Sequence, residues 1–206
     1  MLDRFRILDL TDDRGHFCGM ILGQLGAEVI AIEPPGGQRS RYQGPFAGDV
    51  QDPEKSLTHW AYNRAKQSLV LDLDNNQGLK RLEELAATAD AVVASDGNSV
   101  DLKSLGRLYP HLVTAFISGF GETGPKSDWA ASDIVNTAAS GTMGITGDRD
   151  RAPVRLSLPQ TWHFAASDAL CGILLALRER ESSGLGQHVD VAAQHSYLIA
   201  SQYQML

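Results

Sequence analysis

The sequence lacks long hydrophobic runs: no apolar stretch approaches the roughly 20 residues that cross a bilayer. The N-terminus has neither the charged region nor the apolar core of a signal peptide and passes directly into a strand pattern. Lysine and arginine do not cluster with aromatic residues, and the formal net charge is −7, which disfavours nucleic acid because a polyphosphate needs a cationic surface. We therefore predict a cytoplasmic protein that binds neither membranes nor nucleic acid.

Cysteine is scarce as well. Cys18 and Cys171 each lie within an apolar helical pattern, which predicts two reduced, packed thiols rather than a disulfide or a nucleophile. The histidines show no His-x-x-x-His spacing and there is no Cys-x-x-Cys pair, so we predict no metal site. A Gly-Lys-Ser/Thr phosphate-binding loop is also missing.

What the chain does contain is a regular alternation of short aliphatic runs with amphipathic stretches of helical length. This alternation predicts an α/β fold with a parallel sheet, and 206 residues suffice for one such domain. We expect strands at residues 5–10, 28–33, 68–73, 91–94, 111–118 and 187–191. We expect helices at residues 17–25, 77–88, 102–108, 133–139, 159–180 and 193–206.

Two stretches do not follow this alternation. Residues 34–66 are rich in proline and glycine and have no clear period, which predicts a long ordered excursion with at most short helical turns. The last predicted helix carries apolar Tyr203, Met205 and Leu206 and no capping signal, so we expect a further segment to cover these residues.

Two glycine-containing stretches and one histidine could suggest binding sites, but we interpret all three as structural. Gly119-Phe-Gly-Glu-Thr-Gly124 matches the dinucleotide fingerprint in spacing, but the residues after it continue a loop and do not open a helix. The glycine-containing stretch from Ser182 to Val191 is a turn from helix to strand, and His163 is a partly buried histidine with a local hydrogen bond. We predict no nicotinamide or flavin site.

A set of segments, in its order and spacing, resembles the family III CoA-transferases, the group that includes the formyl-CoA and carnitine enzymes and the α-methylacyl-CoA racemases. The resemblance covers essentially the whole chain. Its carriers are Ile7-Leu-Asp-Leu-Thr11, Leu25-Gly-Ala-Glu-Val-Ile30, Ile32-Glu-Pro-Pro-Gly-Gly37, Asn63-Arg-Ala-Lys-Gln-Ser-Leu-Val-Leu-Asp72, Ser118-Gly-Phe-Gly-Glu-Thr-Gly-Pro125 and Gly184-Leu-Gly-Gln-His-Val-Asp-Val191.

The resemblance implies a Rossmann-like, mostly parallel open sheet with helices on both faces. Residues 1–206 would form the N-terminal large domain, without the small domain and the returning C-terminal segment of the family. It also implies an interlocked dimer. The dimer would be either a homodimer or a heterodimer with an aspartate-bearing paralogue.

Family chemistry is covalent. An aspartate carboxylate attacks the acyl-CoA thioester and expels the CoA thiolate, which gives a mixed anhydride and then an aspartyl-CoA thioester that passes CoA to the acceptor acid. Counting from Pro159 and back from Gly172 places Trp162 at the position of this aspartate. Indole is neither a nucleophile nor a base, so no catalytic residue is assigned.

Neighbouring positions do not restore the chemistry. Asp168 lies six residues further along the predicted helix and would point to another side of it. Racemases of the family use a histidine before the loop aspartate, and Ser132 stands there, before Asp133. The opening Asp9-Leu-Thr-Asp-Asp-Arg-Gly15 and the Pro-Gln-x-x-His pattern from Pro159 to His163 resemble one branch of the family. That branch includes the aspartate-lacking subunit of benzylsuccinate-type CoA-transferases.

The family's CoA contacts map by position onto Asp12 with Arg14 nearby, Pro34, Leu71, Ser95 with Asp96, and Lys103. Arg39 is added as a candidate for a phosphate contact, which gives eight predicted CoA-contacting residues. The loop that usually reads Glu-Asn-Phe is Ala94-Ser95-Asp96 here. Arg41 and Lys66 are further candidates for phosphate contacts.

Three functions follow from the resemblance and stay open at this point. The chain is a non-catalytic subunit that supports CoA transfer by an aspartate-bearing partner, an active transferase with a relocated nucleophile, or a CoA-ester binding scaffold without chemistry. In each case CoA or acyl-CoA is a substrate or ligand, with no permanently bound cofactor.

Overall fold

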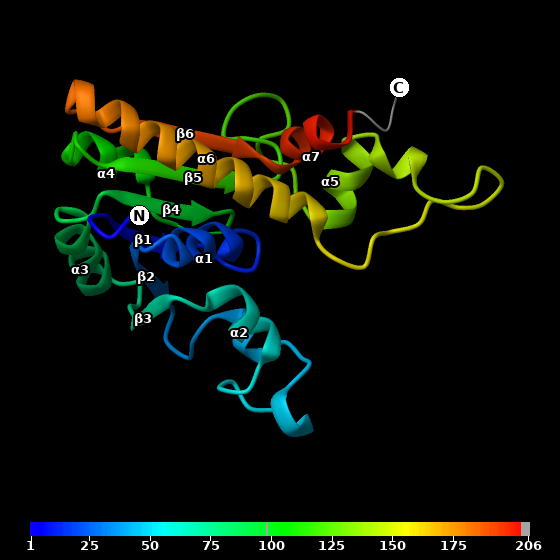
Figure 1. The fold of residues 1–206 in the computed structure, drawn as a ribbon, viewed down its shortest axis with the longest axis horizontal. Coiled ribbons are helices and arrows are strands. Elements are labelled where there is room, and N and C mark those ends of the chain that lie inside the picture. The colour runs from blue at the N-terminus through cyan, green and yellow to red at the C-terminus, as the bar shows by residue number, and fades with distance from the viewer. Residues whose placement is uncertain (98, 203–206) are drawn as a thin grey trace.

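Six parallel strands form one open sheet in the order β3-β2-β1-β4-β5-β6 in the computed structural model (Figure 1), which describes residues 1–97 and 99–202. The strands are β1 (Arg6–Leu10), β2 (Glu28–Glu33), β3 (Lys66–Val70), β4 (Ala91–Ser95), β5 (Val113–Ser118) and β6 (His188–Ala192). The helices are α1 (His16–Gln24), α2 (Leu57–Asn63), α3 (Asn76–Ala86), α4 (Leu102–Leu108), α5 (Asp133–Ala139), α6 (Gln160–Ser183) and α7 (Ala193–Ser201), with 3-10 turns η1 (Arg39–Tyr42), η2 (Ala47–Asp49) and η3 (Thr142–Ile145).

Strand position in the sheet follows strand composition. The central strand β4 is apolar along almost its whole length and buried at every residue, as a parallel strand covered on both faces requires. The edge strand β3 begins with Lys66, Gln67 and Ser68 and is largely exposed. Polar side chains at the edge discourage pairing with another chain.

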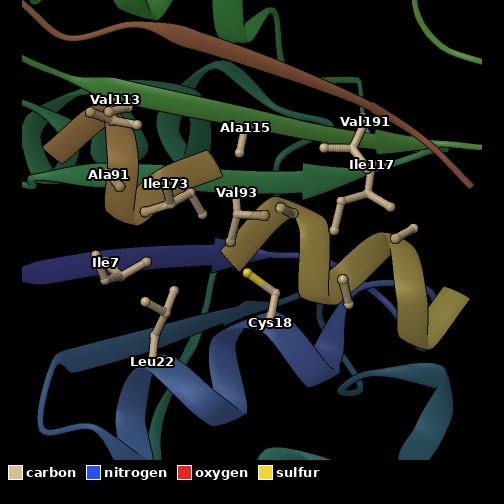
Figure 2. Packing of buried hydrophobic residues seen from close by; sticks show 14 of the residues in the cluster. Ile7, Cys18, Leu22, Ala91, Val93, Val113, Ala115, Ile117, Ile173 and Val191 are labelled. Carbon is tan, nitrogen blue, oxygen red and sulfur yellow. The ribbon is translucent and has the colours of Figure 1, made fainter. Parts of the chain in front are cut away.

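Helices cover both faces of the sheet, which confirms the predicted fold class. On one face, α1 and α6 pack against Ile7, Val93 and Ile117 through residues such as Cys18, Leu22 and Ile173, as Figure 2 shows. On the other face, α3 and α4 cover alternate residues of the same strands, including Leu8 and Val92. The two cores arise because successive strand residues point to opposite faces.

The long helix α6 approaches the sheet closely because its buried stripe is made of small residues. The stripe contains Ala165, Ala166, Ala169 and Ala176, which lie together with Ile173 on one face of the helix. At Gly172, an added Cβ would lie 2.6 Å from a methyl carbon of Val189 in β6. Alanine and glycine therefore set the spacing between α6 and the edge of the sheet.

The predicted elements are present, with corrections at three places. β3 begins and ends earlier than predicted, so Leu71 and Leu73 leave the strand. The excursion at residues 34–66 contains a two-turn helix, α2, whose N-terminus is capped by the Ser56 side chain. Cys171 is exposed, so the prediction of a packed thiol there was wrong, because it lies on the opposite side of α6 from Ala169 and Ile173.

Glycines with positive φ end two of the helices. Gly26 follows α1 at φ +105° and Gly184 caps α6 at φ +74°. The predicted C-terminal helix is present as α7, whereas Tyr203, Met205 and Leu206 lie outside the described residues. Within the described residues, no helix is both long and apolar enough to cross a membrane.

Candidate functional site

The strand order reverses between β1 and β4. From β1 the chain proceeds to β2 and β3 on one side, and from β4 it proceeds to β5 and β6 on the other. In open α/β sheets ligands bind at the carboxyl ends of the strands where the order reverses. A hollow of about 230 Å³ lies at this place.

We call this cavity the switch-point hollow. Residues at and after the carboxyl ends of β1, β2, β3 and β4 line it. Its lining consists of Leu10, Asp12, Arg14, Ile32, Pro34, Pro35, Gln38, Leu71, Asp72, Leu73, Asp74, Ser95, Asp96, Gly97 and Ser99. Six of the eight predicted CoA-contacting residues are among them, and Arg39 and Lys103 are not. The structure thus brings together residues that lie up to 84 positions apart in the sequence, from Asp12 to Asp96.

Asp12 organises the junction between the first turn and β4. The Asp12 carboxylate accepts hydrogen bonds from Arg14 Nε at 2.9 Å to each oxygen and from Ser95 Oγ at 2.9 Å, and the Asp12 N–H donates back to Ser95 Oγ. Burial raises the pKa of Asp12, but the hydrogen bonds and charge of Arg14 outweigh it and hold this pKa below its usual range. The carboxylate is therefore ionised and paired with Arg14.

Asp96 and Lys103 contact residues outside the hollow, and Arg39 is exposed. Asp96 accepts a hydrogen bond from Gly119 N–H at 2.9 Å, and burial raises the pKa of its carboxyl. Lys103 pairs with Glu122 at 3.1 Å, and Arg39 lies exposed on η1.

The further candidates for phosphate contacts are engaged inside the protein. Arg41 donates to both carboxylate oxygens of Glu33, at 2.6 and 2.7 Å. Lys66 Nζ lies 2.8 Å from Asp9 Oδ2, and both side chains are about 2% exposed or less. These ion pairs hold β1, β2 and β3 to the segments around them. The expectation that Arg41 and Lys66 meet phosphates stays a prediction.

Trp162 lies in the first turn of α6 and is 5% exposed. The indole is part of the hydrophobic core that α1 and α6 form with the sheet. The Arg14 guanidinium carbon lies 5.9 Å from the centroid of the indole ring. This distance is within the range of a cation–π contact. Arg14 thus links the indole to the switch-point hollow.

Of the two carboxylates considered near Trp162, Asp133 is buried and Asp168 is exposed. Asp133, at the start of α5, is 9% exposed and accepts hydrogen bonds from Thr161 N–H at 3.1 Å and Thr161 Oγ at 2.9 Å. Asp168, in the middle of α6, is exposed. Ser132 caps α5 by accepting a hydrogen bond from Val135 N–H.

His163 occupies an aromatic pocket between three helices. Its ring stacks on Tyr62 of α2 at 5.3 Å and lies 5.4 Å from the Phe17 ring of α1. Burial lowers the pKa of His163. The imidazole is therefore a neutral packing group at neutral pH.

Sequence reasoning did not identify three features of this region. The contact between Asp133 and Thr161 joins residues 28 positions apart in the sequence, which no local pattern reveals. Asp72 and Asp74 line the hollow because β3 ends before them. Asn136 is fully buried, and neither atom of its amide has a hydrogen-bond partner within the described part of the chain.

Metal chemistry has no evident place among these residues: in the ranges that the structure describes, no group of three or more His, Cys, Asp or Glu side chains could hold an ion. The loop at residues 119–124 continues into turns and does not open a helix, so the structural interpretation of its glycine spacing is confirmed.

Comparison with known proteins gives a consistent result. The sequence profile of CoA-transferase family III matches residues 2–206. The chain is 32% identical over 195 residues to succinyl-CoA:(R)-benzylsuccinate CoA-transferase subunit BbsE of Thauera aromatica, a match covering 92% of this chain and 48% of that protein. It is 36% identical over 201 residues to succinate–glutarate CoA-transferase of Agrobacterium fabrum, covering 93% and 50%.

Solved structures agree with the sequence matches. A CaiB/BaiF family protein from Brucella suis superposes with a TM-score of 0.90 at 29% identity, covering 99% of this chain and 56% of that one. A Mycobacterium tuberculosis protein gives a TM-score of 0.86 at 28% identity, covering 99% and 58%. The chain spans about half the length of the curated relatives that it matches.

Proposed function

The chain belongs to CoA-transferase family III, and from that premise we propose that it takes part in CoA transfer between acyl-CoA thioesters and carboxylic acids as a non-catalytic subunit. The observation that carries the proposal is Trp162. By the sequence resemblance it stands where the family has its nucleophilic aspartate, and its indole is buried in the first turn of α6.

Because its indole is buried, Trp162 cannot take over the role of the nucleophilic aspartate. Indole carbon atoms do not attack thioesters, and a side chain packed into the core leaves no room there for a reacting carbonyl. The fold around it is intact, with the Asp12, Arg14 and Ser95 contacts in place. A preserved scaffold without a nucleophile fits a subunit that supports a competent partner.

The partner that we propose is an aspartate-bearing member of the same family, in a heterodimer. The Thauera aromatica relative supports this idea because its name describes it as a subunit of a CoA-transferase. A homodimer that binds CoA esters without chemistry is the scaffold alternative. The proposed substrate class is acyl-CoA, as in the names of the succinyl-CoA-dependent relatives.

The alternative function is an active transferase in which another carboxylate serves as the nucleophile. For that role, the structure favours Asp133 over Asp168. Its carboxylate is buried next to Thr161, the residue before Trp162, whereas Asp168 is exposed. Asp133 would attack the thioester carbonyl with its carboxylate and release the CoA thiolate, as the family aspartate does. The hydrogen bonds from Thr161 that fix this carboxylate also lower its nucleophilicity, so the subunit role has the stronger support.

Trapping of an activated carboxylate tests the proposal. The protein alone, and its complex with a co-expressed aspartate-bearing paralogue, are incubated with succinyl-CoA and hydroxylamine, and aspartyl hydroxamates are mapped by mass spectrometry. The Agrobacterium fabrum relative is the positive control, and Asp133→Asn is the matched variant. We expect modification on the paralogue and none on this chain.

The other outcomes are equally informative. A hydroxamate at Asp133 that disappears in Asp133→Asn would make this chain an active transferase and overturn the subunit role. A stable homodimer that binds CoA, recruits no paralogue and transfers nothing would favour the scaffold.

A further inference from the structure

A buried polar cluster joins α1 to the excursion at residues 34–66. His16 is the first residue of α1, whereas His59 and Asn63 lie on α2. The two imidazoles are 4% and 8% exposed, and their ring centroids are 6.5 Å apart. Figure 1 shows the excursion extending away from the sheet, with α2 next to α1. The cluster therefore lies where the excursion meets the body of the protein.

The Asn63 amide is oriented by a buried ion pair. Its Oδ1 accepts a hydrogen bond from Lys66 Nζ at 2.9 Å, and an ammonium group can only donate. Lys66 is itself fixed by Asp9 Oδ2, at 2.8 Å. The Asn63 Nδ2 group therefore points the other way, toward His16 Nδ1 and His59 Nδ1, each at 3.2 Å.

This orientation determines where the two imidazoles carry their protons. Because Asn63 Nδ2 is a donor, each Nδ1 atom must accept a hydrogen bond and cannot hold a proton. The Ser40 hydroxyl, 2.8 Å from His59 Nδ1, also donates to it. The cluster thus accommodates His16 and His59 as neutral rings with the proton on Nε2.

Charged groups on several elements surround the two rings. Around His16 they are Lys66 on β3, Asp9 on β1 and Asp12 after β1, and around His59 they are Arg41 on η1, Glu33 on β2, Glu54 before α2, and Lys66. Burial lowers the pKa of both histidines, and the carboxylates oppose this effect without reversing it. The charge environment therefore favours the same neutral state as the hydrogen bonds.

We propose that His16 and His59 form a pH-sensitive switch that holds α2 against α1 and releases it when the imidazoles take up protons. A proton on either Nδ1 would place two donors against each other. The Asn63 amide cannot rotate to relieve this conflict, because Lys66 holds its Oδ1. Separation of α2 from α1 lets water solvate the imidazolium groups, so the excursion opens before the sheet unfolds.

Release of α2 also uncovers the start of α6. Tyr62 of α2 stacks on His163 at 5.3 Å, and its ring lies 6.5 Å from the Phe17 ring of α1. His163 directly follows Trp162 in α6, and burial lowers the pKa of this third imidazole as well. The switch thus controls access to the surface beside Trp162. This inference goes beyond the proposed function and does not depend on it.

Hydrogen exchange measured by mass spectrometry, and corrected for the intrinsic effect of pH on the exchange rate, tests the release. An imidazole whose pKa rises from about 4 to 6.5 on opening makes the open state about 30-fold more populated at pH 5 than at pH 8. We expect this loss of protection in peptides that cover α2. Peptides that cover β4 should stay protected at both pH values, because every residue of that strand is buried.

Three variants separate the switch from a general effect of acid. His16→Gln removes one titratable group and should reduce the 30-fold change at least about fivefold. His195→Gln is the matched control, because His195 is exposed on α7, and it should leave the change as it is. Asn63→Asp replaces the donor with an acceptor of the same shape. It should abolish or reverse the dependence on pH, because a carboxylate stabilises a protonated imidazole.

The unsubstituted chain provides a test that does not depend on the folding of any variant. Long-range proton–nitrogen correlation NMR at pH 7 should show a protonated Nε2 and an unprotonated Nδ1 in both His16 and His59. A proton on either Nδ1 would overturn the inference. So would an equal loss of protection in α2 and β4 at pH 5, or protection of α2 that does not change with pH. None of these measurements involves acyl transfer, so they succeed or fail independently of the trapping experiment.

Discussion

At the residue scale, His16 shows how burial converts a side chain into a source of pH dependence. It is 4% exposed, and its ring Nδ1 lies 3.2 Å from the Asn63 amide nitrogen. Burial, assisted by the positive charge of Lys66, lowers the pKa of His16 from 6.5 to about 4. The native state therefore holds this imidazole in its neutral form.

The sign of the effect on stability follows from the direction of this shift. An unfolded chain takes up a proton on His16 near pH 6.5, whereas the folded chain does so only near pH 4. Stability contributed by the neutral form is complete above pH 6.5 and is lost as the pH falls toward 4. The pKa difference corresponds to a loss on the order of 3 kcal/mol.

We predict that urea unfolding shows this loss between pH 6.5 and 4 and that His16→Gln removes most of it. Glu33 provides an internal comparison. Burial raises its pKa, but hydrogen bonds from Arg41, Ser68 and Gln38 bring it to about 2 from 4.5, so its contribution is lost only below pH 4.5. If His16→Gln keeps the full pH dependence above pH 4.5, the assignment to His16 is wrong.

At the element scale, the contact between α6 and β6 depends on one missing side chain. An added Cβ at Gly172 would lie 2.6 Å from Val189 Cγ1. Val189 is branched at Cβ and lies in a strand, so it has little freedom to move away. The helix or the edge strand would have to shift.

We predict that Gly172→Ala lowers the free energy of unfolding by about 1–3 kcal/mol through overpacking, measured by chemical denaturation. Gly144→Ala is the matched control, because an added Cβ there meets no atom within 4 Å and the residue is not in the left-handed region. A stabilising effect of Gly172→Ala, as expected from helix propensity alone, would mean that the close packing of α6 does not limit this interface.

The sequence predicts elements well where apolar pattern and burial coincide. The apolar run of β4 and the spaced alanines of α6 are examples. β3 was placed too late because its first residues, Lys66 and Gln67, are polar, as an edge strand allows. The helix α2 was not predicted, because the segment that precedes it is rich in proline and glycine.

The positions of Asp12 and Asp96 follow from the strands that precede them, whereas their role in CoA binding stays a prediction. Asp12 and Asp96 meet because parallel strands end at one edge of the sheet. Sequence patterns did not reveal the contacts that the tertiary structure sets. Arg41 pairs with Glu33, Lys66 pairs with Asp9, and Asp133 accepts hydrogen bonds from Thr161, 28 residues along the chain.

At the scale of the whole molecule, one end carries exposed apolar side chains. Figure 1 shows α5 and α7 close together beyond the carboxyl ends of the strands, and the two helices contact each other. Ile134 on α5 and Ile199 on α7 are 47% and 49% exposed. Neighbouring Val135 and Leu198 are also exposed. Exposed apolar residues gathered in this way are typical of protein–protein interfaces.

We predict that this end takes part in the heteromer of the proposed function. Ile134→Glu combined with Ile199→Glu should reduce the amount of co-expressed paralogue that purifies with the tagged protein at least tenfold, because burying two carboxylates without partners costs more than about 1.4 kcal/mol. Leu175→Glu is the control, since Leu175 is 71% exposed elsewhere on α6. Unchanged retention of the paralogue in the double variant would place the subunit interface on another surface. Equal loss in Leu175→Glu would instead indicate a general effect of added charge.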